Sequence, residues 1–268
     1  MFKSLALISG LCFFGLPAAA QTTASTDNLQ ANLVSGWQTK AGTHMAGLQL
    51  ALAPGWKTYW RSPGEAGLPP LFNWSGSVNV KSVRILWPKP IVFAANGMQS
   101  IGYHDQVLLP LEVTPRDPLQ PVQLHATIDL GICRDICLPA SLTLSADLPT
   151  PGAPVAAITA ALAAGPMTAA DAGVVSVSCL VDPIADGMRV TATLRLPLQG
   201  AQEAVVFEAG QPDIWVSAAT TRRHSDTVTA VTEMVAPTGA PFALDRSKIR
   251  LTVIGTDTAV EILGCPAP

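Results

Sequence analysis

Two runs of alternating apolar residues flank a pair of cysteines near the middle of the chain. In residues 122–132 every even-numbered position is apolar, and the odd-numbered positions from 123 to 129 are polar. In residues 138–148 the even-numbered positions are apolar again. A period of two is that of a β-strand with one buried face. The pattern therefore predicts a β-hairpin whose turn carries Cys133 and Cys137.

Short alternating runs broken by Gly, Pro, Asn and Asp recur along the chain, which is typical of all-β proteins. Residues 249–263 predict a further hairpin that turns at Thr256 and Asp257. An alanine-rich segment framed by Pro and Gly interrupts the pattern and predicts a short helix at residues 155–164. We therefore expect an all-β fold. It consists of two immunoglobulin-like β-sandwich domains, residues 21–149 and 172–268, joined by an Ala/Pro-rich linker at residues 150–171.

The first twenty residues have the features of a secretory signal peptide. Lys3 is their only charge, residues 5–16 are apolar, and three alanines at 18–20 offer a cleavage site. We expect residues 1–20, with Cys12, to be removed on export. The mature protein should then reside in an oxidising compartment.

The charge balance argues against nucleic-acid binding. The net charge is −3 and no basic run is present, so the chain has no electrostatic footprint for nucleic acid. Charged residues make up 13% of the sequence and hydrophobic residues 49%. This composition favours well-buried cores over disorder.

Four cysteines remain after residue 20, and an even number in an exported chain indicates disulfides. Cys179 and Cys265 bracket the whole expected second domain, and we expect them to form a structural disulfide. Such a long closed loop would stabilise the fold by roughly 4.6 kcal/mol in the chain-entropy model. The loop between Cys133 and Cys137 is short, and its closure would contribute only roughly 2 kcal/mol.

Three interpretations of the Cys133–Cys137 pair follow from its spacing. As a staple it contributes little, and as a zinc site it lacks ligands, because no second Cys-x-x-Cys or His-x₃-His accompanies it. Two thiolates can still hold Cu(I). As a redox centre, a hairpin tip would present the sulfurs to a partner. Arg134 would favour the thiolate and Asp135 would oppose it.

Three motifs that occur in order narrow these alternatives: "GWKTYWRSPGEAGLPP" at residues 55–70, "IGYHDQVLLP" at residues 101–110 and "GICRDICLPA" at residues 131–140. Together they resemble the N-terminal periplasmic domain of the DsbD-type thiol:disulfide interchange proteins. The resemblance covers about residues 27–150 and points to the ScsB-like branch, which is associated with suppression of copper sensitivity. The three-residue spacing of the cysteines supports that branch, because the best-known DsbD members space theirs five residues apart.

The resemblance implies a periplasmic thiol–disulfide oxidoreductase that works without an organic cofactor. Cys133 and Cys137 would be the exchanging thiols in an immunoglobulin-like sandwich. The family covers its cysteines with a cap loop, which should fall at residues 93–97 and include Asn96. Phe93 is a candidate for the lid, with a core position at a strand end as the alternative. Further candidates to line the site are the residues Trp56, Tyr59, Trp60, Tyr103, His104 and Asp105. For the three aromatic residues at 56–60, core packing is the alternative.

The resemblance also implies the partners. Fused family members continue into a membrane domain and a thioredoxin-like domain, and this sequence contains neither. We therefore expect a separate membrane-embedded DsbD/CcdA-like reductase as the electron donor. Periplasmic thioredoxin-like or copper-handling proteins would be the acceptors, and no nucleic acid is involved. Two alternatives are a copper-tolerance protein that binds Cu(I) through Cys133 and Cys137, and a non-redox immunoglobulin-like interaction module.

Overall fold

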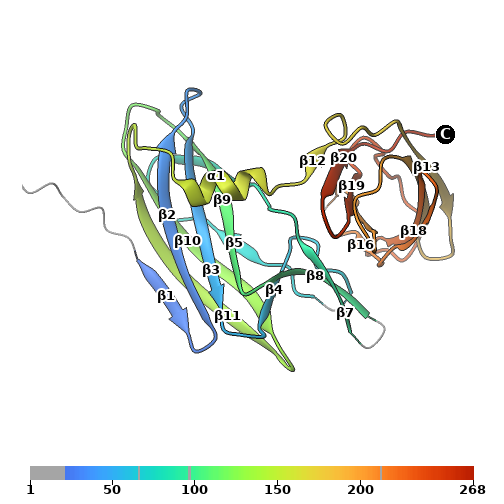
Figure 1. Cartoon of the computed structure of the whole chain (residues 1–268), viewed down its shortest axis with the longest axis horizontal. Coiled ribbons are helices and arrows are strands. Elements are labelled where there is room, and N and C mark those ends of the chain that lie inside the picture. Colours follow the sequence, from blue (N-terminus) through green and yellow to red (C-terminus); the bar gives the residue numbers. More distant parts are fainter. Residues whose placement is uncertain (1–21, 66, 96–97, 212) are drawn as a thin grey trace, which may run out of the picture.

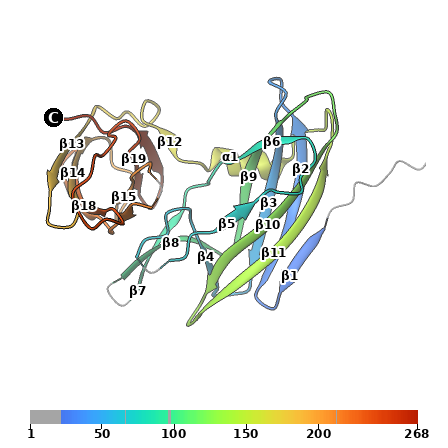
Figure 2. The same ribbon diagram turned by 180° about the vertical axis from the view of Figure 1, so that it is seen from behind.

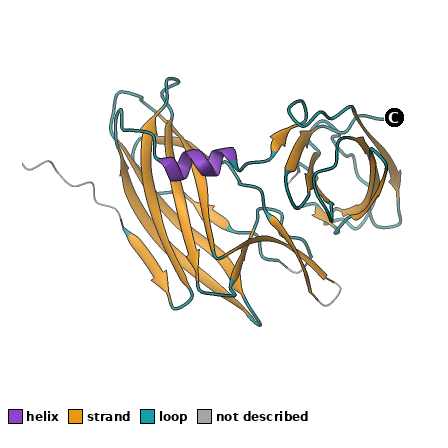
Figure 3. Ribbon diagram, in the orientation of Figure 1, coloured by secondary structure: helices purple, strands orange, loops and turns teal. Residues whose placement is uncertain are grey.

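The computed structural model describes residues 22–65, 67–95, 98–211 and 213–268. These residues form mainly antiparallel sheets with a single α-helix among them, α1 (Ala156–Ala163), which Figure 3 shows in purple. The prediction of an all-β fold is confirmed, since one short helix is the exception among the described residues. Within the described ranges, no helix has the length and apolar character that a membrane crossing requires. The expected signal peptide at residues 1–20 lies outside the described residues.

The first set of strands builds two sheets, which we call the N-terminal sandwich (residues 22–149; Figure 1). One sheet has the order β1 (Thr23–Thr26), β2 (Leu29–Gln38), β3 (His44–Leu52), β9 (Gln106–Pro115), β6 (Val80–Ile85). The other has the order β11 (Cys137–Leu148), β10 (Val122–Cys133), β4 (Lys57–Tyr59), β8 (Met98–His104), β7 (Ile91–Ala95), with β5 (Leu71–Asn73) paired to β10.

The predicted hairpin is formed by β10 and β11. Their register runs without a break from the pair Val122–Leu148 to the pair Cys133–Cys137. The even-numbered side chains of β10, and those of β11 from Ala140 to Leu148, are buried in the core between the two sheets, because alternate residues of a strand point to the same side. Leu138, next to Cys137 at the tip of the hairpin, is exposed. The hydrophobic alternation in the sequence thus sets which face of this hairpin is covered.

The second set of strands builds two further sheets, which we call the C-terminal sandwich (residues 167–268; Figure 2). One sheet has the order β12 (Met167–Thr168), β20 (Ala259–Leu263), β19 (Arg250–Ile254), β15 (Ala204–Glu208). The other has the order β13 (Ser176–Pro183), β14 (Met188–Arg195), β18 (Thr227–Val235), β16 (Trp215–Val216), with β17 (Thr220–His224) paired to β18. The β19–β20 hairpin confirms the hairpin predicted at residues 249–263.

A disulfide between Cys179 and Cys265 joins the two sheets of the C-terminal sandwich. Cys179 lies on β13, and Cys265 follows β20 in the other sheet. Both cysteines are buried, and Arg246 donates a hydrogen bond to the backbone carbonyl of Cys179. The bond is therefore enclosed in the core, away from any reaction partner.

The helix α1 packs on the N-terminal sandwich, in the segment where the sequence predicts a linker. Its Ile158 is fully buried against two glycines of the sheet, Gly36 on β2 and Gly47 on β3. A Cβ atom at either glycine would lie within about 3.3 Å of the Ile158 side chain. Because glycine has no Cβ atom, these two positions leave the space into which Ile158 packs. Residues 167 and 168 form β12 and pair in parallel with β20.

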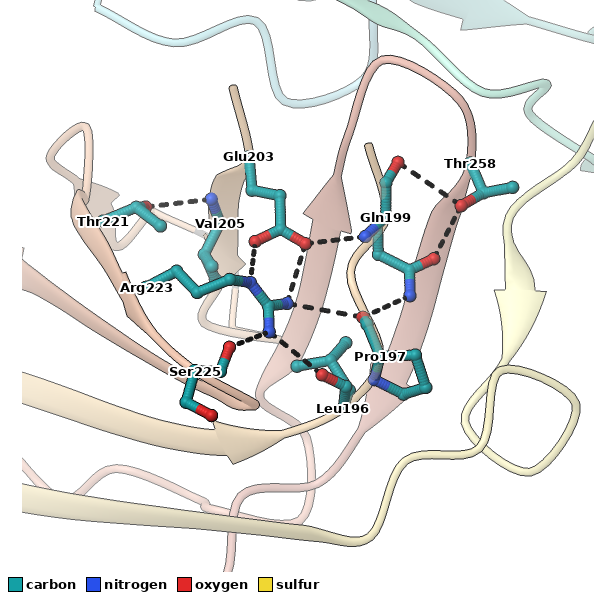
Figure 4. Close-up of polar contacts among 9 residues, drawn as sticks. All are labelled: Leu196, Pro197, Gln199, Glu203, Val205, Thr221, Arg223, Ser225 and Thr258. Atoms are coloured by element: carbon teal, nitrogen blue, oxygen red, sulfur yellow. Dashed lines mark hydrogen bonds and ion pairs between the residues drawn. The ribbon is translucent and has the colours of Figure 1, made fainter. Parts of the chain in front are cut away.

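A buried ion pair ties together the loops at one end of the C-terminal sandwich (Figure 4). The side chain of Glu203 is only 4% exposed and accepts hydrogen bonds from the Arg223 guanidinium and the Gln199 backbone. Arg223 also donates to the carbonyl groups of Leu196, Pro197 and Ser225. Because the hydrogen bonds of both ions are directed at groups within the fold, we assign this network a structural role.

We expect Glu203→Ala to destabilise the C-terminal sandwich by about 3–5 kcal/mol, because the substitution leaves the Arg223 charge enclosed without its partner. The matched control is Glu233→Ala, which breaks the solvent-exposed ion pair with Arg189 and should cost about 0–1 kcal/mol. Urea unfolding followed by circular dichroism measures both values. Equal destabilisation by the two substitutions would contradict the assignment.

Candidate functional site

The site is a disulfide at the tip of the β10–β11 hairpin. Cys133 ends β10, Cys137 begins β11, and their Cα atoms are 4.1 Å apart as a cross-strand pair. The two sulfurs have different surroundings, since Cys133 is 2% exposed whereas Cys137 is exposed. A thiolate arriving from solvent can therefore reach Cys137, while Cys133 is shielded.

Tyr59 is the side chain that contacts both sulfurs. Its hydroxyl oxygen lies 2.9 Å from Cys133 Sγ and 3.4 Å from Cys137 Sγ. Sulfur atoms in a disulfide carry no hydrogen, so the hydroxyl is the donor in these contacts. Burial raises the pKa of Tyr59 above its ordinary value, so the hydroxyl keeps its proton at neutral pH and remains a donor.

The position of Tyr59 follows from the pairing of β4 with β10. Thr58 lies opposite Ile132 and Lys57 opposite Cys133. The Thr58 hydroxyl donates to the Gly131 carbonyl at 2.9 Å and fastens the two strands together. Because Tyr59 is two residues from Lys57, both side chains point to the face of the sheet that carries the disulfide.

Two glycines leave room for the Tyr59 ring. A Cβ atom on Gly131 would lie 3.3 Å from Tyr59 Cε2 and equally close to Leu68, and one on Gly67 would lie 2.9 Å from Tyr59 Cδ1. Gly67 and Leu68 belong to the loop that follows β4, so this loop folds back over the ring. The ring is therefore confined between the hairpin and the loop, with its hydroxyl directed at the sulfurs.

A second cluster lies beside the disulfide on the neighbouring strands. Lys57 is the register partner of both Cys133 and, on β8, His104. The Phe93 ring on β7 packs edge-on against the His104 ring, with the Lys57 ammonium group 4.9 Å from its centre. Lys57 also donates to the Ser100 hydroxyl at 3.1 Å. Phe93 thus covers the residues next to Cys133 in register.

The other expected site residues have different places. Trp60 is fully buried in the core of the N-terminal sandwich. Tyr103 is also buried; its hydroxyl donates to the Pro88 carbonyl, and burial raises its pKa far above the ordinary value. His104 is half-exposed, and its Nδ1 lies 2.5 Å from a carboxylate oxygen of Asp105. Asn96 lies outside the described residues.

The turn between the cysteines is charged and exposed. Arg134 donates a hydrogen bond to the carboxylate of its neighbour Asp135 at 3.0 Å. The guanidinium of Arg134 also lies 5.7 Å from the Trp56 ring centre, and its side chain covers Gly55. These contacts anchor the turn to the loop that precedes β4.

The donor set at the site is small. In the part of the chain that the structure describes, no group of three or more His, Cys, Asp or Glu side chains is arranged to hold a metal ion. The disulfide itself offers two sulfurs, with a phenolic hydroxyl rather than a carboxylate or imidazole in contact with them.

The sequence groups Tyr59 with Trp56 and Trp60 as candidates to line the site, with core packing as the alternative. The β4–β10 pairing separates Tyr59 from the two tryptophans. In the segment Lys57–Thr58–Tyr59–Trp60 the side chains alternate across the sheet, so Tyr59 shares the disulfide face once Lys57 is placed opposite Cys133. That placement depends on a pairing between strands far apart in the sequence.

Comparison with known proteins gives a family match and a structural match. Residues 28–149 match the family described as "Thiol:disulfide interchange protein DsbD, N-terminal". A solved structure described as the N-terminal periplasmic domain of ScsB from Proteus mirabilis is similar in fold, with 22% identity and a TM-score of 0.72. The match covers 93% of this chain and 99% of that one. No curated protein sequence matches the chain. The resemblance inferred from the three motifs is confirmed.

We expect Tyr59→Phe to make the Cys133 thiol of the reduced site less acidic, because the hydroxyl has one hydrogen to donate and lies closer to Cys133 Sγ. A hydrogen bond to a charged group is worth roughly 1.5–3 kcal/mol, so losing it should move the midpoint of the pH profile of alkylation up by about 1–2 pH units. Mass spectrometry of the reduced protein, alkylated across a pH series, measures this midpoint for each cysteine. Tyr103→Phe is the matched control, because its hydroxyl bonds Pro88 and should leave the profile in place. An unchanged profile in Tyr59→Phe would contradict the assigned contact.

Proposed function

From the similarity of residues 28–149 to DsbD N-terminal domains, we propose that the chain is a periplasmic thiol:disulfide interchange protein. Electrons pass through Cys133 and Cys137 from a membrane-embedded reductase to periplasmic thioredoxin-like or copper-handling proteins. The observation that carries the proposal is the asymmetry of the disulfide. Cys137 is open to a partner, whereas Cys133 is buried with its sulfur against the Tyr59 hydroxyl.

Reduction of the site begins at Cys137. A thiolate of the reductase attacks Cys137 Sγ, a mixed disulfide forms, and the bond to Cys133 breaks with its electron pair left on Cys133. The Tyr59 hydroxyl donates to the departing Cys133 thiolate, which makes it a better leaving group. A second thiolate of the reductase then displaces Cys137, so the reductase becomes oxidised and both cysteines are reduced.

Transfer to the acceptor runs through the same atoms. The Cys137 thiolate attacks one sulfur of the acceptor's disulfide and forms a mixed disulfide, and the other acceptor sulfur leaves as a thiolate. Cys133 then attacks Cys137 Sγ, which restores the disulfide and releases the acceptor as a dithiol. Two electrons and two protons move in total, and no organic cofactor takes part.

Exposed apolar side chains lie on and beside the hairpin that carries the open sulfur, and they suit a protein partner. Ile136 beside Cys137 is 64% exposed, and Leu68, which packs beside Gly131, is 54% exposed. Leu71 lies on the same sheet face, because it pairs with Asp129 on the odd-numbered side of β10. Large apolar residues left in solvent around a reactive atom favour a docking surface for another protein.

The proposal includes a division into domains. Residues 21–149 would form the redox domain, residues 150–171 the linker and residues 172–268 a second immunoglobulin-like domain. Support comes from the separate sheets and from the two clusters of buried hydrophobic residues, one centred in each sandwich. The pairing of β12 with β20 favours placing the start of the second domain at Met167.

Single-cysteine variants test the function. We expect Cys133→Ser, which keeps the exposed Cys137, to form a stable mixed disulfide with a thioredoxin-like protein that lacks its resolving cysteine and carries thionitrobenzoate on the remaining one. The Cys137 thiolate attacks the partner's sulfur, and thionitrobenzoate leaves as a thiolate. Cys137→Ser should give only background, because the remaining sulfur is buried. Non-reducing electrophoresis and mass spectrometry identify the adduct.

Trapping by neither variant, or by both equally, would contradict the proposal. The double variant Cys133→Ser/Cys137→Ser separates the alternatives. A copper-binding protein would lose stoichiometric Cu(I) binding in this variant. A non-redox module would fold and bind its partner as before.

A further inference from the structure

Arg61 links the disulfide site to the C-terminal sandwich. It follows Tyr59 by two residues, and its guanidinium donates hydrogen bonds to both carboxylate oxygens of Glu208 at 2.9–3.2 Å. It also donates to Glu261 at 2.6 Å. Glu208 and Glu261 lie on β15 and β20, on either side of β19. Arg61 is only 17% exposed, so water screens this contact poorly.

Three consecutive residues connect the site with this contact. Tyr59 touches the sulfurs, Trp60 is fully buried in the N-terminal core, and Arg61 reaches the C-terminal sandwich. The Arg61 guanidinium lies 4.3 Å from the centre of the Trp60 ring, and the Trp60 amide donates to the Ile101 carbonyl at 3.0 Å. A packed core transmits displacement, so a shift of Arg61 is felt at Tyr59.

Two cavities interrupt the contact between the sandwiches on either side of Arg61. Their volumes are about 600 and 420 Å³, and both are lined by Arg61 and Arg250. Lys89 makes a second contact and donates to the carbonyl groups of Gly255 and Thr256. The Arg61 ion pairs are the contact that starts two residues from Tyr59, the residue that touches the sulfurs.

We propose that Arg61, Glu208 and Glu261 are positioning residues for disulfide exchange, through which the C-terminal sandwich holds the Tyr59 hydroxyl on Cys133 Sγ. The inference rests on the proposed function, in which Cys133 is the leaving thiolate. Under this inference the C-terminal sandwich affects the rate of disulfide exchange, although none of its residues touches the sulfurs in the described structure. When the tie is broken, the β4 segment is free to shift and the leaving thiolate loses its donor.

The test measures the rate at which dithiothreitol reduces the Cys133–Cys137 disulfide of the full chain. Arg61→Met keeps a side chain over Trp60 but cannot bind the carboxylates. Glu208→Gln/Glu261→Gln keeps Arg61 and removes its charged partners. Both variants should slow reduction about three-fold or more, because the rate depends on the leaving thiolate. Arg189→Met, which breaks an exposed ion pair of the C-terminal sandwich, is the control and should react at the wild-type rate.

Tyr59→Phe distinguishes positioning from a general loss of structure. In that background the Arg61 and Glu208/Glu261 changes should cause no further slowing, because the donor they position is already absent. Circular dichroism and an intact Cys179–Cys265 bond report on folding.

Wild-type rates in folded Arg61→Met and Glu208→Gln/Glu261→Gln would overturn the inference and leave the proposed function standing. Slowing of equal size with and without Tyr59 would overturn it too. A wild-type Cys133–Cys137 bond that resists dithiothreitol while the fold is intact would overturn the proposed function itself, and the role of the tie with it.

Discussion

The short pairing of β4 with β10 determines the chemistry of this molecule. It places Lys57 opposite Cys133, and the alternation of side chains then turns Tyr59 toward the sulfurs. Without this pairing the hairpin would carry a disulfide with no donor beside it. With it, one phenolic hydroxyl lies within hydrogen-bonding range of both sulfurs, and burial keeps that hydroxyl protonated. The glycines at 67 and 131 help to place this hydroxyl, because a side chain at either position would crowd the Tyr59 ring.

The two disulfides of the chain illustrate how surroundings assign different roles to the same bond. Cys179 and Cys265 are both buried and join two sheets, so no partner has access to either sulfur. Cys133 and Cys137 close a hairpin whose register is already held by the β10–β11 ladder. Their bond adds little to the fold, and one of its sulfurs is open. These differences favour a structural role for the first bond and an exchange role for the second.

Much of this arrangement could be predicted from local patterns. Period-two alternation predicted the β10–β11 hairpin, the spacing of the cysteines placed both at its tip, and the alanine-rich segment predicted α1. The side-chain directions at Tyr59 and Trp60 could not be predicted, because they depend on the pairing of β4 with a strand more than 70 residues away. The contact of Arg61 with Glu208 and Glu261 joins residues 147 and 200 positions apart, and no periodicity reports such a contact. Likewise, the packing of α1 depends on two glycines in distant strands.

The central claim is that Cys133–Cys137 is an exchange site, and its reduction potential tests that claim most directly. The mature protein would be equilibrated in graded thiol buffers, and its free thiols trapped and assigned by mass spectrometry. Cys179–Cys265 serves as an internal reference in the same molecule. We predict a potential well above about −300 mV for Cys133–Cys137, with Cys179–Cys265 still oxidised. A potential below about −300 mV for both bonds would show that the hairpin disulfide is a staple and would contradict the account.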